Sequence, residues 1–201
     1  RDGGKTWGKA LYTGLRIHVI NDYGAYYHFG HGTQGNALAQ ATGPYRIPGF
    51  EYTVQCVLTN KCQQGVFRGA GSDANNFALE RLVDAAAQEL GLDRVEIRRR
   101  NFIRPDAFPF KMPAGNIYDS GDYPKVLDQA LTMAGWDELK KMQAEARAQG
   151  RLVGIGLATA QQRSVYGPTE FWFWYDAPGL TSVPESVGLS VGPTGEFIVT
   201  M

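Results

Sequence analysis

The sequence is poor in cysteine and histidine, and each shortage argues against a class of protein. Cys56 and Cys62 are the only cysteines in 201 residues, and their spacing forms neither a CxxC pair nor a disulfide ladder. We interpret them as buried, reduced thiols, which fits a cytoplasmic protein. His28 and His31 lie in a glycine-rich stretch without the further ligands that zinc needs, so we predict no metal site formed by these residues.

The chain also lacks an excess of either charge. It contains 20 basic and 20 acidic residues, whereas a nucleic-acid-binding protein usually carries a basic excess, so that class is disfavoured. No apolar run approaches the roughly 18 residues of a membrane-spanning helix. The sequence opens at Arg1 without a secretory signal and stops at Met201 inside a strand-like run, so we expect both ends to lie within a longer protein.

Strand-like and helix-like hydrophobic periods both occur, which predicts an α+β fold. The predicted strands are 15–20, 51–59, 152–159, 171–175, 189–191 and 196–199, and the predicted helices are 36–41, Ser72 or Asp73 to Gly91, a basic helix after Asp93, 124–134 and 136–149. The proline-rich stretch 104–123 is the best internal boundary.

The long helix that follows residue 71 should present one buried face. Its predicted apolar stripe consists of Phe77, Leu79, Leu82, Val83, Ala86 and Leu90. Ser72 or Asp73 should cap its start, and Gly91 should end it. We interpret the nearby run Arg98–Arg100 as a solvated helix end with ion pairs in preference to an anion-binding patch.

Residues 65–71 (GVFRGAG) place one arginine among three glycines directly before this helix. Backbone N–H groups at a helix N-terminus attract anions, and an arginine adds a forked, charged contact. The stretch has neither a Walker A motif nor the GxGxxG spacing of a dinucleotide fold. The residues alone leave two interpretations open: an anion-binding loop, and a tight turn whose arginine binds a neighbouring carbonyl.

Several motifs, taken together and in order, resemble the molybdopterin-binding large subunit of the xanthine dehydrogenase and aldehyde oxidase family, which includes the large chain of aerobic carbon monoxide dehydrogenase. They are 22–26 (DYGAY), 42–48 (TGPYRIP), 58–60 (LTN), 67–71 (FRGAG), 77–81 (FALER), 89–93 (ELGLD), 95–101 (VEIRRRN) and 118–123 (YDSGDY). The resemblance implies an internal fragment of the two molybdopterin-binding domains. Residues 1–104 would end the first domain, and 105–201 would form a linker and the start of the second.

The resemblance also assigns roles to the loop. Phe67, Arg68, Gly69, Ala70 and Gly71 would contact the molybdenum–molybdopterin cofactor and the substrate pocket, with Arg68 as a catalytic residue. Purine-oxidising members have an aromatic residue at the place of Ala70 and an arginine near that of Asn36, which makes purine oxidation doubtful. Carbon monoxide oxidisers have a copper-binding cysteine at the place of Gly69.

The family reaction is hydroxylation by water, here of an aldehyde or N-heterocycle. The resemblance implies that iron–sulfur clusters and FAD on partner subunits or domains accept the electrons, and that the complete enzyme is a dimer of heterotrimers. The family's catalytic glutamate and its upstream FGGK-type loop are absent from this sequence, so we expect the isolated chain to be inactive. Two other classes stay open: a non-enzymatic fold or assembly module with the loop as a structural turn, and a phosphate- or nucleotide-binding protein.

Overall fold

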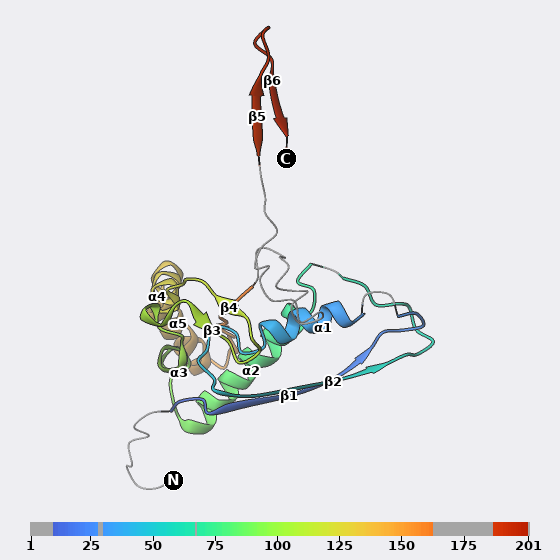
Figure 1. Ribbon diagram of the computed structural model, residues 1–201. Helices are drawn as coiled ribbons and strands as arrows, with labels where there is room; N and C mark the ends of the chain where they lie inside the picture. Colours follow the sequence, from blue (N-terminus) through green and yellow to red (C-terminus); the bar gives the residue numbers. More distant parts are fainter. Residues whose placement is uncertain (1–9, 28–29, 67, 163–186, 201) are drawn as a thin grey trace. The chain divides into compact units, whose positions relative to one another are not determined.

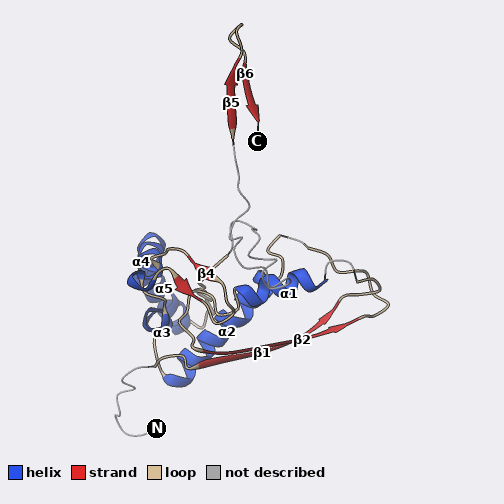
Figure 2. Ribbon diagram, in the orientation of Figure 1, coloured by secondary structure: helices blue, strands red, loops and turns tan. Residues whose placement is uncertain are grey.

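The computed structural model describes residues 10–27, 30–66, 68–162 and 187–200. The chain divides into two compact units, residues 1–162 and 163–201, and each is described here by itself. Figure 1 and Figure 2 show the elements along the chain. The predicted strand 171–175 and Phe67 lie outside the described residues.

The first unit contains a parallel pair of strands joined through a helix. Strand β1 (Gly14–Asp22) pairs with β2 (Gly49–Val57) over its whole length, from Gly14 opposite Gly49 to Asp22 opposite Val57. Helix α1 (Gly30–Ala39) lies between them in the sequence. The hydroxyl of Tyr52 on β2 donates to Gln34 of α1 at 3.2 Å, so this helix lies against the strand pair.

The two thiols do not occupy the buried positions predicted for them. Cys56 and Cys62 are both exposed. The alternation of β2 breaks after Val54, so that Val57 is the next half-buried residue and Cys56 lies on the exposed side. Leu58, which follows β2, is also exposed.

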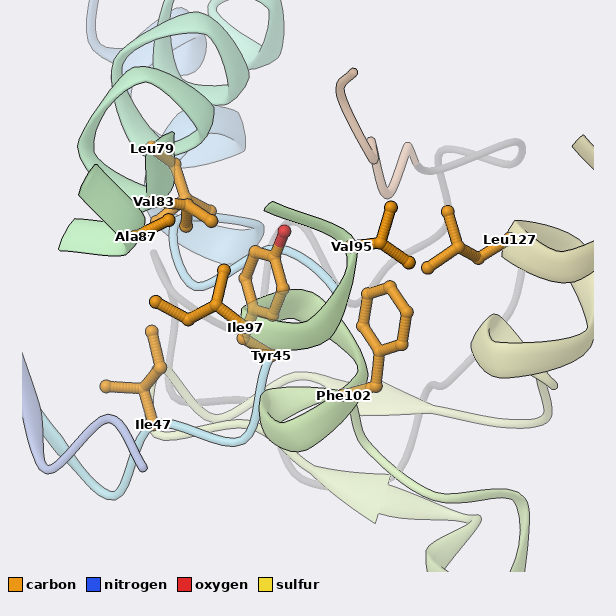
Figure 3. Packing of buried hydrophobic residues seen from close by; sticks show 9 residues of the cluster. All are labelled: Tyr45, Ile47, Leu79, Val83, Ala87, Val95, Ile97, Phe102 and Leu127. Atoms are coloured by element: carbon orange, nitrogen blue, oxygen red, sulfur yellow. The ribbon is translucent and has the colours of Figure 1, made fainter. Parts of the chain in front are cut away.

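Helices α2 (Ser72–Leu90) and α3 (Arg94–Asn101) carry much of the main core. Figure 3 shows this core, which consists of Tyr45, Ile47, Leu79, Val83, Ala87, Val95, Ile97, Phe102 and Leu127. The Tyr45 ring stacks on Phe102 with the ring centroids 5.6 Å apart. Gly91 ends α2 in the left-handed conformation, and the Asp93 carboxylate caps α3 by accepting from the N–H groups of Val95 and Glu96, both as predicted.

The predicted cap of α2 is wrong, and its predicted apolar stripe is right only in part. The N-cap is Gly71, and no side chain caps it. Leu79 and Val83 of the stripe are buried, whereas Phe77 and Leu82 are 71% and 54% exposed. The other buried residues of the helix are Ser72, Asn75, Glu80 and Ala87. The buried face therefore includes polar side chains that have partners inside the protein, and it is rotated away from the purely apolar stripe.

The polar partners centre on Arg98, whose side chain is fully buried. Its guanidinium donates to Glu80 at 2.8 and 3.0 Å and to Asp84 at 2.9 Å. Glu80 also accepts from the Tyr45 hydroxyl at 2.5 Å. Burial disfavours the charge on Arg98, but the Glu80 carboxylate outweighs it and the pKa of Arg98 is raised. Arg98 is therefore not the solvated cation predicted from the run Arg98–Arg100. Arg99 and Arg100 do form the predicted ion pairs at the surface, with Asp128 and Glu96.

The remainder of the first unit includes a second, smaller hydrophobic cluster formed by Ile103, Met112 and Tyr118. Residues 104–123 contain the 3₁₀ helix η1 (Pro105–Ala107) and the short hairpin β3 (Phe110–Lys111) and β4 (Ile117–Tyr118), with Met112 and Tyr118 buried. Helix α4 (Tyr123–Ala134) is capped by Asp122 and separated from α5 (Trp136–Ala148) by the left-handed Gly135. In the second unit, β5 (Gly188–Val191) and β6 (Phe197–Thr200) form an antiparallel hairpin at the predicted positions.

Residues 152–159, predicted as a strand, pair with no other described strand. Their exposure still alternates, with Val153, Ile155, Leu157 and Thr159 half-buried. Side chains take the place of a neighbouring strand: Arg94 and Arg98 donate to the carbonyls of Ile155 and Leu157, and Glu80 accepts from the Thr159 N–H.

Loss of the Glu80 charge should loosen this centre. Glu80→Gln in the full-length protein leaves Asp84 as the one charged partner of the buried Arg98 among the described residues. Breaking a buried pair costs about 3 kcal/mol or more. We expect the slowest amides of α2 and α3 to exchange hydrogen on the order of a hundredfold faster or more, measured by mass spectrometry.

Glu96→Gln is the matched control, because its pair with Arg100 is partly exposed and spans one turn of α3. Such pairs contribute about 0.5 kcal/mol or less. Equal exchange in the two variants would contradict a central role for the buried pair.

Candidate functional site

The loop Arg68–Gly71 has an unusual backbone at the start of α2. The φ angles of Arg68, Gly69, Ala70 and Gly71 are +24°, +109°, +46° and +90°. A residue with a side chain rarely adopts positive φ, and each such residue costs on the order of 1–3 kcal/mol. Arg68 and Ala70 keep this conformation only because the surrounding residues hold the loop.

Two side chains hold the loop through its carbonyls. The Asn36 amide, which is 1% exposed, donates to the carbonyl of Gly69 at 3.2 Å and to that of Ala70 at 3.0 Å. Ser72 donates to the Gly69 carbonyl from its hydroxyl at 2.5 Å and from its backbone N–H at 2.9 Å. The loop is therefore attached both to α1 and to the first residue of α2.

Gly71 lets the loop approach α1 closely. A Cβ atom at this position would lie 2.4 Å from the Thr33 carbonyl oxygen and 3.4 Å from the Ala37 Cβ. Contacts under 3.0 Å are not tolerated, so only glycine fits here without a shift of α1 or the loop.

The loop leaves several hydrogen-bond donors available. Within the part of the chain that the structure describes, the N–H groups of residues 68–71 donate to no acceptor, and no side chain caps α2. Arg68 is exposed and has no hydrogen-bond or ion-pair partner among the same residues. Free N–H groups, a helix N-terminus and a guanidinium together form a site suited to an anionic oxygen.

One nearby charge opposes an anion. The Asp73 carboxylate lies in the first turn of α2, and its Oδ1 is 3.3 Å from the position of a Cβ on Gly69. It interacts favourably with the helix N-terminus itself. An anion is therefore best accommodated on the side of the loop away from Asp73.

The other candidates from the sequence do not join this site. His28 and the side chain of His31 lie outside the described residues. No group of three or more histidine, cysteine, aspartate or glutamate side chains suited to a metal occurs in the described portion of the chain. The buried guanidinium of this protein belongs to Arg98, and Arg68 is exposed.

Sequence reasoning missed the role of Asn36 in the loop. An amide among small residues, in Gly35–Ala41 (GNALAQA), is the signal that could have found it, because a polar side chain on a closely packed helix needs a partner. That partner is a backbone segment more than 30 residues away, and no local pattern specifies it.

Comparison with known proteins identifies the kind of polypeptide. Residues 9–102 match the molybdopterin cofactor-binding domain. The nicotine 6-hydroxylase large subunit of Paenarthrobacter nicotinovorans is 36% identical over 194 residues, which are 94% of this chain and 23% of that protein. The carbon monoxide dehydrogenase large chain of Hydrogenophaga pseudoflava is 34% identical over 201 residues, covering 96% of this chain and 24% of that protein. The crystal structure of quinoline 2-oxidoreductase from Pseudomonas putida 86 superposes with a TM-score of 0.76 at 31% identity, over 93% of this chain and 24% of that chain.

These similarities define a molybdopterin-binding polypeptide. The chain belongs to the molybdenum hydroxylase family of xanthine dehydrogenases, aldehyde oxidoreductases and carbon monoxide dehydrogenases, as part of the large subunit. The resemblance and the α+β class predicted from the sequence are thereby confirmed. The chain spans about a quarter of the length of the curated relatives described above. Among the described helices, none is both long and apolar enough to cross a membrane.

Gly71→Ala should displace α1 from the loop. The added Cβ would meet the Thr33 carbonyl, so we expect faster hydrogen exchange in α1 and reduced bound molybdenum in the full-length protein. Gly115→Ala is the control, because Gly115 also has a positive φ of +100° but a Cβ there meets nothing within 4 Å. Equal effects of the two substitutions would show that the close approach at Gly71 does not matter.

Proposed function

We propose that this chain forms part of the large subunit of a molybdenum-dependent hydroxylase that oxidises an aldehyde or an N-heterocycle, with water as the source of oxygen. The loop Arg68–Gly71 carries the proposal, because it offers anion-binding donors within a chain that matches the molybdopterin-binding domain. The names of two relatives, a nicotine 6-hydroxylase and a quinoline 2-oxidoreductase, refer to N-heterocycles and support that substrate class.

The residues present fit the cofactor. Molybdopterin carries a phosphate, and the free N–H groups of the loop and the uncapped start of α2 suit an anionic oxygen. Arg68, Gly69, Ala70 and Gly71 would hold the cofactor, with Phe67 as support, and Arg68 would act as the catalytic residue. The bound cofactor supplies the redox chemistry of hydroxylation, while Arg68 contributes a fixed positive charge at the edge of the substrate pocket.

The domain bounds, the partner subunits and the compartment are proposed from the same family. Residues 1–104 would end the first molybdopterin-binding domain and 105–201 would form the linker and the start of the second, in keeping with a domain match that ends at 102. Relatives named as a large subunit and a large chain suggest partner subunits, which would carry iron–sulfur clusters and FAD in a dimer of heterotrimers. We place the enzyme in the cytoplasm.

The alternative of a purely structural turn has less support. In that interpretation Arg68 would bind a neighbouring carbonyl, but the guanidinium has no such partner among the described residues. A turn also has no need of positive φ at both Arg68 and Ala70.

Arg68→Ala in the assembled enzyme should lower turnover roughly ten- to hundredfold, because a charge-assisted contact contributes on the order of 1.5–3 kcal/mol. Turnover is measured with aldehyde and N-heterocycle substrates and divided by bound molybdenum. Arg104→Ala is the control, since the Arg104 side chain is 78% exposed and its one ion-pair partner among the described residues, Asp106, is 74% exposed. An unchanged rate per molybdenum in Arg68→Ala would leave the loop as a structural turn.

The enzyme should not oxidise carbon monoxide. Gly69 stands where carbon monoxide oxidisers of the family have a cysteine, and glycine supplies no thiolate for Cu(I). We expect the purified enzyme to contain no stoichiometric copper and to leave an electron-accepting dye unreduced under carbon monoxide. Rapid dye reduction together with bound copper would contradict this prediction.

A further inference from the structure

The carbonyls of the loop Arg68–Gly71 are fixed by a chain of buried amides that the family assignment does not explain. The Asn36 amide donates to the carbonyls of Gly69 and Ala70, which uses both of its N–H groups. Its Oδ1 accepts from the side chain of Gln40 at 3.0 Å. Asn36 and Gln40 are 1% and 0% exposed, so these bonds do not compete with bulk water.

A third amide connects this chain to α2. Asn75, one turn into that helix and 8% exposed, directs its side-chain amide at the carbonyls of Gln40 and Ala41, at 3.5 and 3.4 Å. These contacts are long, so Asn75 orients the helices more weakly than Asn36 orients the loop. Together the three amides link α1, the loop and α2.

Fixing two carbonyls also fixes two N–H groups. In a trans peptide the C=O and N–H of one unit point in opposite directions. The Gly69 carbonyl shares its peptide with the N–H of Ala70, and the Ala70 carbonyl shares its peptide with the N–H of Gly71. Because Asn36 draws both carbonyls toward α1, both N–H groups point away from that helix, and neither has an acceptor in the described part of the chain.

We propose that Asn36, oriented by Gln40, is a positioning residue that aims the N–H groups of Ala70 and Gly71 at an anionic oxygen. The oxygen belongs either to the bound cofactor or to the substrate as negative charge develops on it. This inference rests on the proposed function. It assigns to the buried amide at position 36 a role exerted through the loop, without contact to the ligand.

The hydrogen bonds of Asn36 to the loop show that its side chain does more than fill space. An apolar side chain of similar size at position 36 would fill the same volume but would leave the Ala70 carbonyl without its donor, at about 1–3 kcal/mol if the group stays buried. The Gly69 carbonyl would keep only its bonds from Ser72. The substitution would also remove the constraint that keeps Ala70, a residue with a Cβ, at a φ of +46°. The loop would then relax, and the directions of its N–H groups would change.

The test compares variants of the assembled enzyme. Asn36→Leu and Asn36→Asp keep the approximate volume and remove the donor. Asn101→Leu is the matched control, because Asn101 is also a buried amide, 2% exposed, whose bonds go to Ala10, Tyr12 and Ile97 and not to the loop. For each variant we would measure the melting temperature, the molybdenum bound per polypeptide, the Mo(V) electron paramagnetic resonance spectrum, and kcat and KM.

We expect both Asn36 variants to lose on the order of tenfold or more in bound molybdenum or in kcat per molybdenum. Displacement of a preorganised N–H donor has effects of this size or larger. A loss of bound molybdenum would assign the oxygen to the cofactor. A loss of kcat per molybdenum with an altered Mo(V) spectrum and normal loading would assign it to the substrate. Asn101→Leu should lower the melting temperature and leave loading per folded polypeptide, the spectrum and kcat per molybdenum unchanged.

The proposal is overturned if the Asn36 variants keep wild-type loading, spectrum and kcat, or if Asn101→Leu changes these quantities as much as they do. In those cases the wild-type enzyme still contains molybdenum and turns over, so the proposed function stands. A wild-type enzyme that binds no molybdenum overturns both.

Discussion

The buried ion pair between Arg98 and Glu80 is the constraint on which the rest of the first unit depends. A guanidinium with no exposure requires acceptors, and it finds them on α2, on α3 and in the extended segment that ends at Thr159. Glu80 in turn accepts from Tyr45, whose phenol pKa is raised by burial first and by this carboxylate second, so that the hydroxyl remains a donor. Glu80 faces inward on α2, and Leu82, two residues further along and on nearly the opposite side of the helix, is exposed.

The rotation of α2 that this pair imposes also places the candidate site. Asn75 and Ser72 lie one and two turns before the buried Leu79 on the same side of α2, and they face α1 and the loop. Gly71 then comes into contact with the Thr33 carbonyl, and no residue with a Cβ can take its place. The chemistry of the loop is thus connected to a charge pair in the core by successive turns of one helix.

The sequence predicts those elements whose causes are local. Alternation locates β1 and β2, the left-handed glycines end α2 and α4, and Asp93 caps the helix that follows it. It fails where a distant partner decides the outcome. Burial of Arg98 depends on the carboxylates of Asp84 and Glu80, 14 and 18 residues away. Residues 152–159 keep the alternation of a strand, but side chains take the place of the neighbouring strand. In the site, the glycine loop and Arg68 are visible as a motif. The small residues around Asn36 mark it only as an amide that needs a partner, and its acceptors, the carbonyls of Gly69 and Ala70, come from another part of the chain.

The loop geometry also limits which residue position 69 can hold. At a φ of +109° almost any side chain is strained, so a cysteine at position 69 would require a different backbone from the one that Asn36 and Ser72 stabilise. A thiolate there would also lie beside the Asp73 carboxylate, and the like charges would oppose its ionisation and hence its use as a Cu(I) ligand. The barrier to copper binding is therefore more than the absence of one sulfur atom, because the hydrogen bonds from Asn36 and Ser72 to the loop also stabilise a backbone that only glycine adopts readily at that position.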